Sequence, residues 1–520
     1  MFITLLSLFS APSFLNIRIN SDTEPALPYH NEEQIVVNPK DSANLVACWR
    51  DFRLGYRQVA IGVSFDGGLT WEDRLITNSG LQYDSDPGLT TDADGNIYLV
   101  MLSFNEDREE MAIPVYKSTD GGLTFGEPSY AVHSYGTTFL DKELMACDRT
   151  ESDYRGNLYV VWTYVVDETT YIYCVTSGDG GKSWSEPARV SDVNRVMWPV
   201  PCVGPDGTLY VAWIARYAVH EPDSIMIDRS TDGGITWGND LAIARVKGFC
   251  TIDFFIDAWS FPAMDTDISG GPFSGNLYIA YMSSGLYETK DIFLVRSTDG
   301  GDTWSSPITI SGEDTPYNDQ FHPWLVVDNL GIIHVVFYDQ RNGLEEDLQD
   351  LYYTKSEDGG DTWTYPYRVS TVASKPAEVE LPCFAAGSMP AGIYGEYVGL
   401  AAWNGRPFPV WTDCREDGVE NIYFGWYDSE AVAEHPRAES QELKSMFVPG
   451  GLKVSFHAPM TGRFGFKLFD VSGRGIFAVT RVLNHSREVL LDAGDLPKGI
   501  YYLHTDDNAM IRSTRLVKIN

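Results

Sequence analysis

The segment STDGGITW, residues 230–237, is one of six nearly identical copies along the chain. Each copy follows the pattern Ser-x-Asp-Gly-Gly-x-Thr/Ser and ends in Trp or Phe. Consecutive copies are 53 to 67 residues apart, and a repeat of that length in a β-rich chain is typical of a propeller or another repeat array. The aspartates of the six copies are Asp66, Asp120, Asp179, Asp232, Asp299 and Asp358.

The residues around each copy predict four strands per repeat. A β-rich run precedes every copy, for example NLVACW from residue 44 and NLYVVW from residue 157. A seventh such run, PFPVWTD from residue 407, is followed by ENIYFGWYD from residue 420 but by no Asp-Gly-Gly segment. Since four strands make one propeller blade, the sequence predicts six complete blades and a seventh that lacks its fourth strand.

The segment FLNIRINSD, residues 14–22, has the alternation of a strand and comes before the first blade. An open blade would leave an unpaired strand edge, which proteins avoid. We therefore expect residues 14–22 to supply the outer strand of blade seven. The predicted fold is an all-β, seven-bladed propeller closed by its own N-terminal segment, with a six-bladed ring as the alternative.

The repeated segment itself is predicted to be a structural turn between the third and fourth strands. Its two glycines permit positive φ angles, and its Asp and Ser can bind the backbone N–H groups of the turn. A catalytic site needs different groups converging on one point, and six equivalent copies around a ring cannot do so. The six aspartates are therefore expected to be structural.

This pattern resembles the Asp-box, or BNR, repeat of sialidase-like propellers over roughly residues 30–430. The resemblance implies a protein that acts on or binds glycans, because that superfamily includes sialidases, other glycan-cleaving enzymes and non-catalytic binding proteins.

The C-terminal residues 446–520 no longer follow the repeat, and they carry ten Lys/Arg against six Asp/Glu in a chain of net charge −35. Short alternating strands predict a small β-sandwich there, after a linker at 431–445. The segments LFDVSGR (468–474), DLPKGIYYL (495–503) and RLVKIN (515–520) resemble the sorting domain of type IX secretion cargo. That resemblance implies contact with secretion and anchoring machinery; a generic β accessory domain is the alternative.

The N-terminal residues 1–13 are apolar and end in small residues, which predicts a signal peptide, with a buried first strand as the alternative. We expect a monomer that is secreted or held at the outer cell surface, with its propeller spanning residues 14–430.

The acidic net charge argues against nucleic acid as a partner, and no apolar run reaches the length of a transmembrane helix.

Three Asp-x-Arg units end the second strands of blades one, six and seven, which are neighbours in a closed ring. Residues two apart on a strand share a side, so each unit can be a local ion pair. Alternatively, the three guanidinium groups form a clamp for a carboxylate or another anion. The units are Asp51–Arg53, Asp339–Arg341 and Asp413–Arg415.

The resemblance to sialidases implies a Tyr nucleophile assisted by Glu, and an Asp as acid/base. The matching candidates are Tyr394 or Tyr397 with Glu396, and Asp51 or Asp319. The Arg-Ile-Pro motif of sialidases is absent, since Asn20 follows Arg18 and Ile19 here. The seven cysteines show no metal-binding spacing, so no metal site or cofactor is predicted, although the acidic charge leaves room for calcium.

Two functions remain open from the sequence. The first is a sialidase-like glycoside hydrolase, and the second is a non-catalytic propeller that binds a glycan or a protein.

Overall fold

The computed structural model describes an all-β protein, and no helix occurs among the residues that it describes. These are residues 13–22, 25, 27, 29–136, 138–167, 169–216, 223–247, 258, 261–285, 289–312, 318–342, 348–375, 397–416, 419–428, 444–448, 451–470, 475–492, 499–506 and 511–518. The chain divides into two compact units, Met1–Glu430 and Ala431–Asn520.

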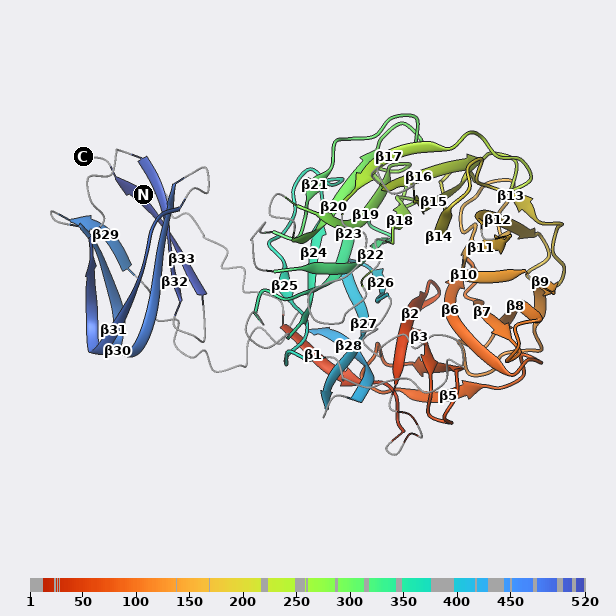
Figure 1. The fold of residues 1–520 in the computed structure, drawn as a ribbon, viewed down its shortest axis with the longest axis horizontal. Helices are drawn as coiled ribbons and strands as arrows, with labels where there is room; N and C mark the ends of the chain where they lie inside the picture. Colours follow the sequence, from red (N-terminus) through yellow and green to blue (C-terminus); the bar gives the residue numbers. More distant parts are fainter. Residues whose placement is uncertain are drawn as a thin grey trace. The chain divides into compact units, whose positions relative to one another are not determined.

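The first unit is a seven-bladed β-propeller, as predicted, and each blade is a sheet of four antiparallel strands (Figure 1). Blades one to three consist of β2 (His30–Asn38), β3 (Asp41–Asp51), β4 (Gln58–Ser64) and β5 (Glu72–Ile76); β6 (Tyr83–Thr91), β7 (Ile97–Phe104), β8 (Glu110–Ser118) and β9 (Ser129–Tyr135); and β10 (Phe139–Cys147), β11 (Leu158–Val166), β12 (Thr169–Ser177) and β13 (Ala188–Arg189).

The remaining four blades follow the same order from the axis outward, except that β1 completes the last one. They consist of β14 (Val196–Val203), β15 (Leu209–Ala215), β16 (Asp223–Ser230) and β17 (Leu241–Val246); β18 (Ala263–Thr266), β19 (Leu277–Ser284), β20 (Lys290–Ser297) and β21 (Ile308–Thr309); β22 (Gln320–Val327), β23 (Ile333–Asp339), β24 (Asp350–Ser356) and β25 (Tyr367–Arg368); and β26 (Gly399–Trp403), β27 (Arg406–Glu416), β28 (Val419–Asp428) and β1 (Ser13–Arg18).

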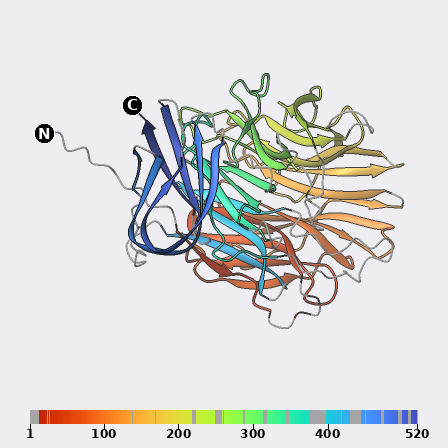
Figure 2. The same ribbon diagram turned by 60° about the vertical axis from the view of Figure 1, so that its left-hand side comes forward.

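The inner strands enclose the central axis (Figures 1 and 2). Each contacts the inner strand of the next blade, and β26 contacts β2, so the ring is closed. Because strands alternate in direction, the loops from second to third strands and from blade to blade share one face, called the loop face below. The turns between first and second and between third and fourth strands share the opposite face, called the turn face.

The N-terminal strand β1 closes blade seven, which confirms the expected role of this segment. It pairs antiparallel with β28 from Ser13↔Asp428 to Arg18↔Tyr423. The side chain of Phe14 is 6% exposed and packs against the rings of Tyr353 and Tyr427. Closure of the ring therefore depends on both hydrogen bonding and the burial of an aromatic side chain.

Buried aromatic side chains on the second strands fill the space between blades. Trp49, Trp162, Trp213 and Trp411 occupy equivalent positions on β3, β11, β15 and β27 and are at most 1% exposed. The hydrophobic clusters around them combine residues of adjacent blades. Packing between blades therefore supplies most of the core, and the sheets alone do not.

The six Asp-Gly-Gly segments form turns that are hydrogen-bonded in the same way. In the segment at 230–237, Ser230 donates to Asp232, and the backbone N–H and hydroxyl of Thr236 both donate to the Asp232 carboxylate. Burial works against the shift, but the hydrogen bonds from Thr236 and Ser230 lower the pKa of Asp232 to about 2. Each carboxylate is thus used within its own turn.

We expect Gly68→Ala to destabilise the protein more than Gly156→Ala. Both glycines have positive φ, 94° and 84°, so both substitutions add backbone strain of about 1–2 kcal/mol. A Cβ at Gly68 would also overlap the ring of Phe424 in blade seven, whereas nothing lies within 4 Å of one at Gly156. The extra loss in the free energy of unfolding is expected to be about 1–3 kcal/mol, measured by denaturant titration; equal losses would contradict the close packing of blades one and seven.

The second unit contains one five-stranded antiparallel sheet. Its strands follow the order β29-β30-β32-β33, and β31 pairs with β30. Leu452, Val454, Phe466 and Leu468 of β30 are fully buried. The strands are β29 (Lys444–Val448), β30 (Gly451–Asp470), β31 (Gly475–Leu491), β32 (Gly499–Asp506) and β33 (Ile511–Lys518).

In the part of the chain that is described, no helix is long and apolar enough to span a membrane.

Candidate functional site

A β-bulge interrupts the inner strand of five blades near its loop-face end. At each bulge two residues of the inner strand face one residue of the second strand, as with Glu32 and Glu33 opposite Trp49. The first bulge residue has a positive φ of 44° to 60° although none is glycine. Such strain is costly and concentrates at functional sites, so the bulges mark a candidate site.

The first bulge residues form a ring around the axis, called the axial ring below. Blades five and seven are aligned with the other blades through the strand pairs Ala263↔Ala280 and Gly399↔Val410. In the other blades the equivalent pair comes directly after the bulge, so the residue two positions before Ala263 or Gly399 takes the first bulge position. The axial ring comprises Glu32, Asp86, Lys142, Trp198, Phe261, His322 and Tyr397. Charged residues come from blades one to three and aromatic or imidazole rings from blades four to seven.

The axial ring closes the central channel, because its side chains meet across the axis. The Lys142 ammonium of blade three lies 3.0 Å from the ring centroid of Tyr397 in blade seven and 5.6 Å from that of Phe261. Phe261 also packs against Trp198 and His322, with centroids 4.5 and 6.5 Å apart. The seven side chains are at most 8% exposed.

The acidic members of the axial ring are linked to one another and to basic groups. The backbone N–H of Asp86 donates to the Glu32 carboxylate at 3.0 Å, and Arg50 pairs with the other oxygen of Glu32. Ser85 donates to Asp86 at 2.6 Å. Burial works against ionisation, but Lys142, Ser85 and Arg50 lower the pKa of Asp86. Asp86 is therefore held as a carboxylate at neutral pH.

Glu143, the second bulge residue of blade three, has the opposite electrostatic character. Its side chain is fully buried, and neither carboxyl oxygen has a hydrogen-bond partner among the described residues. Burial, and next the negative charge of Asp86, raise the pKa of Glu143 well above its ordinary value. The pKa values of Glu143 and Asp86 are thus displaced in opposite directions, a difference that acid–base catalysis can use.

Glu33 holds the same bulge position in blade one but is hydrogen-bonded. Its oxygens accept from the backbone N–H and the hydroxyl of Thr412 in blade seven, both at 2.9 Å. Four of the other blades have proline at this position: Pro87, Pro199, Pro262 and Pro323. Glu33 is therefore a structural link between blades, and Glu143 is the unpaired counterpart.

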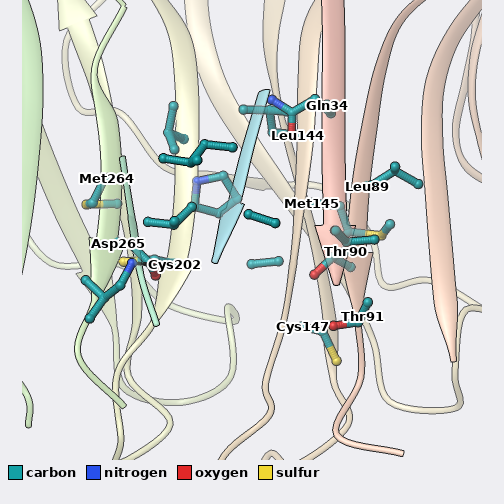
Figure 3. A pocket seen from close by; sticks show the side chains of 18 of the residues that line it. Gln34, Leu89, Thr90, Thr91, Leu144, Met145, Cys147, Cys202, Met264 and Asp265 are labelled. Atoms are coloured by element: carbon teal, nitrogen blue, oxygen red, sulfur yellow. Dashed lines mark hydrogen bonds between the residues drawn. The ribbon is translucent and has the colours of Figure 1, made fainter. Parts of the chain in front are cut away.

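A cavity of about 180 Å³ lies along the axis on the turn-face side of the axial ring (Figure 3). Its wall is formed by inner-strand residues that follow the bulges, including Gln34, Thr90, Met145 and Cys202. Asp265 also lines it, and burial raises the pKa of this carboxyl group. Arg149 lines the cavity as well, so charged side chains occur both here and in the axial ring.

The three predicted Asp-x-Arg units form local ion pairs, one of the two alternatives. Arg53 binds Asp51 and, at 2.7 Å, Asp73 on outer strand β5. Arg341 binds Asp339 and the carbonyl of Ser311. Each guanidinium group thus joins the Asp of its own unit to a residue of another strand or loop.

Arg415 in blade seven follows the same plan. It binds Asp413 at 2.6 Å and the side chain of Asn16, on the closing strand β1, at 3.0 Å. Its guanidinium also lies over the ring of Tyr423. The unit therefore fastens β1 to its blade.

Of the five predicted catalytic residues, the structure describes Tyr397, Asp319 and Asp51. Tyr394 and Glu396 lie outside the described residues. Tyr397 belongs to the axial ring, where burial and the carboxylates of Glu32 and Asp86 raise its pKa well above the ordinary value, which opposes a nucleophilic phenolate. Asp319 accepts a hydrogen bond from the backbone of Lys290 at 2.7 Å.

Asp51 is fully buried, and its carboxyl oxygens accept several hydrogen bonds. Trp49 Nε1 donates to it at 2.9 Å, as does the backbone N–H of Arg53, and His30 Nε2 lies 3.4 Å away. The side chain of Asp51 is therefore held in place by its hydrogen bonds. The five described cysteines are buried: Cys48, Cys147, Cys174, Cys202 and Cys414.

The stability of the propeller is expected to fall as the pH rises towards 8. Burial raises the pKa of Glu33 from 4.5 to about 8, despite its hydrogen bonds to Thr412. A raised pKa in the folded state gives stability that is fully present below pH 4.5 and is lost as the pH passes through about 8. Glu33→Gln should remove the contribution of Glu33 to this dependence and stabilise the protein at pH 8.5 by on the order of 2 kcal/mol, measured by denaturant titration. The same pH dependence in wild type and variant would contradict the buried, protonated state of Glu33.

Comparison with known proteins gives structural neighbours and no sequence family. No family model matches the chain, and no curated protein matches it. An α-L-arabinofuranosidase from Fusarium graminearum is 16% identical with a TM-score of 0.45, over 62% of this chain and 92% of that one. A Penicillium chrysogenum α-L-arabinanase is 17% identical with a TM-score of 0.45, over 63% and 94%. A Hadza microbial sialidase is 15% identical with a TM-score of 0.40, over 59% and 63%.

Propellers of similar shape carry unrelated functions, so the function of this chain has to be argued from its own residues.

Proposed function

We propose that this protein is a sialidase-like propeller that acts on glycans as a glycoside hydrolase, with the axial ring and Glu143 as its catalytic centre. The observation that carries the proposal is the pair Glu143 and Asp86, whose pKa values are displaced in opposite directions by burial and by neighbouring charges. Two carboxyl groups tuned apart in this way supply an acid and a base at the same pH.

The proposed reaction is the hydrolysis of a glycosidic bond. Protonated Glu143 donates its proton to the glycosidic oxygen as the bond from that oxygen to the anomeric carbon breaks. A water molecule bonds to the anomeric carbon and gives its proton to ionised Asp86. Lys142 lowers the pKa of Asp86 and so favours its ionised form. Proton exchange with solvent then restores both carboxyl groups.

The test is release of methylumbelliferone from a panel of glycosides that includes the sialoside and common hexosides and pentosides. Release from at least one substrate by the folded wild-type protein is the expected result. Absence of release across the whole panel, with the fold verified by its thermal transition, would reject hydrolysis of these terminal sugars.

The second candidate is a non-catalytic glycan- or protein-binding propeller. It is favoured by the burial of the axial ring, in which no side chain is more than 8% exposed, and by the local pairing of Arg53, Arg341 and Arg415. Binding to a glycan array without release from any glycoside would identify this function.

We also propose that the protein is secreted or held at the outer cell surface by its C-terminal unit. The support is the apolar stretch at residues 1–13 and the three sorting-domain-like segments within 446–520. In a host with type IX secretion, the full chain is expected outside the cell, and a chain without residues 446–520 inside. The same location for both would reject a sorting role.

A further inference from the structure

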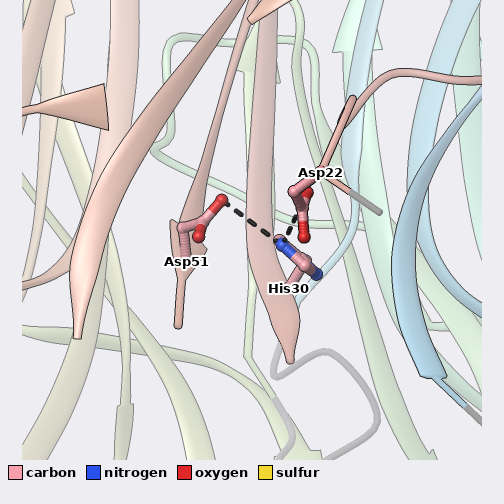
Figure 4. A group of neighbouring side chains, drawn as sticks. All are labelled: Asp22, His30 and Asp51. Atoms are coloured by element: carbon pink, nitrogen blue, oxygen red, sulfur yellow. Dashed lines mark ion pairs between the residues drawn. The ribbon is translucent and has the colours of Figure 1, made fainter. Parts of the chain in front are cut away.

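Three metal-binding side chains meet on the loop face, where the closing segment passes blade one. Asp22 follows β1, His30 begins β2 and Asp51 ends β3 (Figure 4). One ligand atom of each lies within 4.8 Å of the others. His30 and Asp51 are fully buried, and the side chain of Asp22 is 11% exposed.

The orientation of His30 leaves Nε2 directed at the two carboxylates. Its Nδ1 lies 2.7 Å from the carbonyl oxygen of Glu420, so Nδ1 carries a proton and donates it there. A metal-binding histidine is commonly oriented by such a bond from its second nitrogen. Within the described part of the chain, neither His30 Nε2 nor Asp22 Oδ2 has a hydrogen-bond partner.

The distances around Nε2 fit a shared ion better than two hydrogen bonds. Nε2 lies 3.3 Å from Asp22 Oδ1 and 3.4 Å from Asp51 Oδ2. A charge-assisted N–H···O bond is about 2.7–2.9 Å long. Ligands about 2.0–2.1 Å from a tetrahedral ion are about 3.3–3.4 Å from one another, which matches both separations from Nε2. The two carboxylate oxygens lie within 4.8 Å of each other.

The local charges also leave room for a divalent cation. Asp22, Asp51 and Asp73 bring three negative charges, and Arg53 brings one positive charge, bound to Asp51 and Asp73 at 2.7 Å. A divalent ion beside a neutral His30 makes this group of side chains electrically neutral. Trp49 Nε1 and Arg53 hold the Asp51 carboxylate in place.

We propose that Asp22, His30 and Asp51 bind one divalent transition-metal ion of the zinc type, with a fourth position left for water. The imidazole ligand and the small number of oxygens suit zinc and not calcium. The ion joins the segment after β1 to two strands of blade one, so it fastens the closure of the ring. This site is independent of the glycan chemistry proposed for the axial ring, although Glu32 lies only two residues from His30.

The test combines metal analysis with thermal unfolding of the full chain. After removal of metal with a chelator and dialysis against zinc, the wild type is expected to retain about one ion per chain and to unfold several degrees higher than the metal-free protein. His30→Gln and Asp22→Asn are expected to retain no ion and to show no shift with zinc. Asp22→Asn serves if His30→Gln fails to fold, because Asp22 is the most exposed ligand.

His133→Gln is the matched control, since His133 pairs with the single carboxylate of Glu110 at 2.9 Å on the surface of blade two. It should bind zinc as the wild type does. A wild type without bound ion and without a thermal shift would overturn the proposal. Equal zinc binding by His30→Gln and the wild type would also overturn it.

Discussion

Replacing Glu143 by Gln is expected to lower kcat on the best glycoside of the panel by about 10²–10⁴-fold, the usual contribution of a general acid. Gln has the shape of the protonated acid but holds no proton to transfer. The side chain of Glu143 is fully buried without a hydrogen-bond partner among the described residues, so the fold should tolerate the change. Steady-state kinetics of wild type and variant measure the effect.

Glu33→Gln is the matched control for this prediction. Glu33 and Glu143 hold the same bulge position, one in blade one and one in blade three, and both are buried. The carboxyl oxygens of Glu33 accept hydrogen bonds from Thr412, so replacing Glu33 should leave kcat within a few-fold of the wild type. Equal losses in both variants would show that the effect is structural and that Glu143 has no role as an acid.

Deleting residues 1–18 is expected to remove most or all of the folded monomer. The deletion exposes the paired edge of β28 and removes Phe14, which is 6% exposed. Loss of a buried Phe side chain alone costs about 3–5 kcal/mol, against a typical total stability of about 5–15 kcal/mol. The open edge also favours association between chains. Size-exclusion chromatography with light scattering should therefore show oligomers or aggregate.

Two point variants separate pairing from side-chain packing. Phe14→Ala should destabilise the monomer by about 3–5 kcal/mol, whereas Leu15→Lys, at a side chain that is 54% exposed, should stay within about 0.5 kcal/mol of the wild type. A chain without residues 1–18 that remains monomeric with an unchanged unfolding midpoint would contradict closure by β1.

The number of blades and their closure could be predicted because both depend on local, repeated signals. Second strands recur seven times and Asp-Gly-Gly turns six times, and the mismatch identified the closing strand at residues 14–22. The bulges could not be predicted. The alternation of buried and exposed residues along a strand does not show where a single extra residue is inserted. Only the pairing register with the second strand shows the position of the bulge.

The candidate site was harder to predict for a related reason. The Asp-x-Arg units were visible as a pattern, but their guanidinium groups are used to bind outer strands, as Arg53 binds Asp73. Apart from Tyr397, the axial ring was missed, because each blade supplies a different residue type at the same position and no motif repeats. A signal was present in the recurring x-Pro steps of four inner strands, such as Asp86-Pro87 and His322-Pro323, with Glu143 where proline is expected.

The measurement that tests the central claim most directly is the pH dependence of kcat/KM for the wild type and Glu143→Gln. A raised pKa keeps Glu143 protonated, so the wild-type rate should fall on the alkaline side as this proton is lost, and it should persist to low pH because the pKa of Asp86 is lowered. The variant should have a low rate without the alkaline fall. A variant with the wild-type rate and the same alkaline fall would contradict the assignment of Glu143 as the acid.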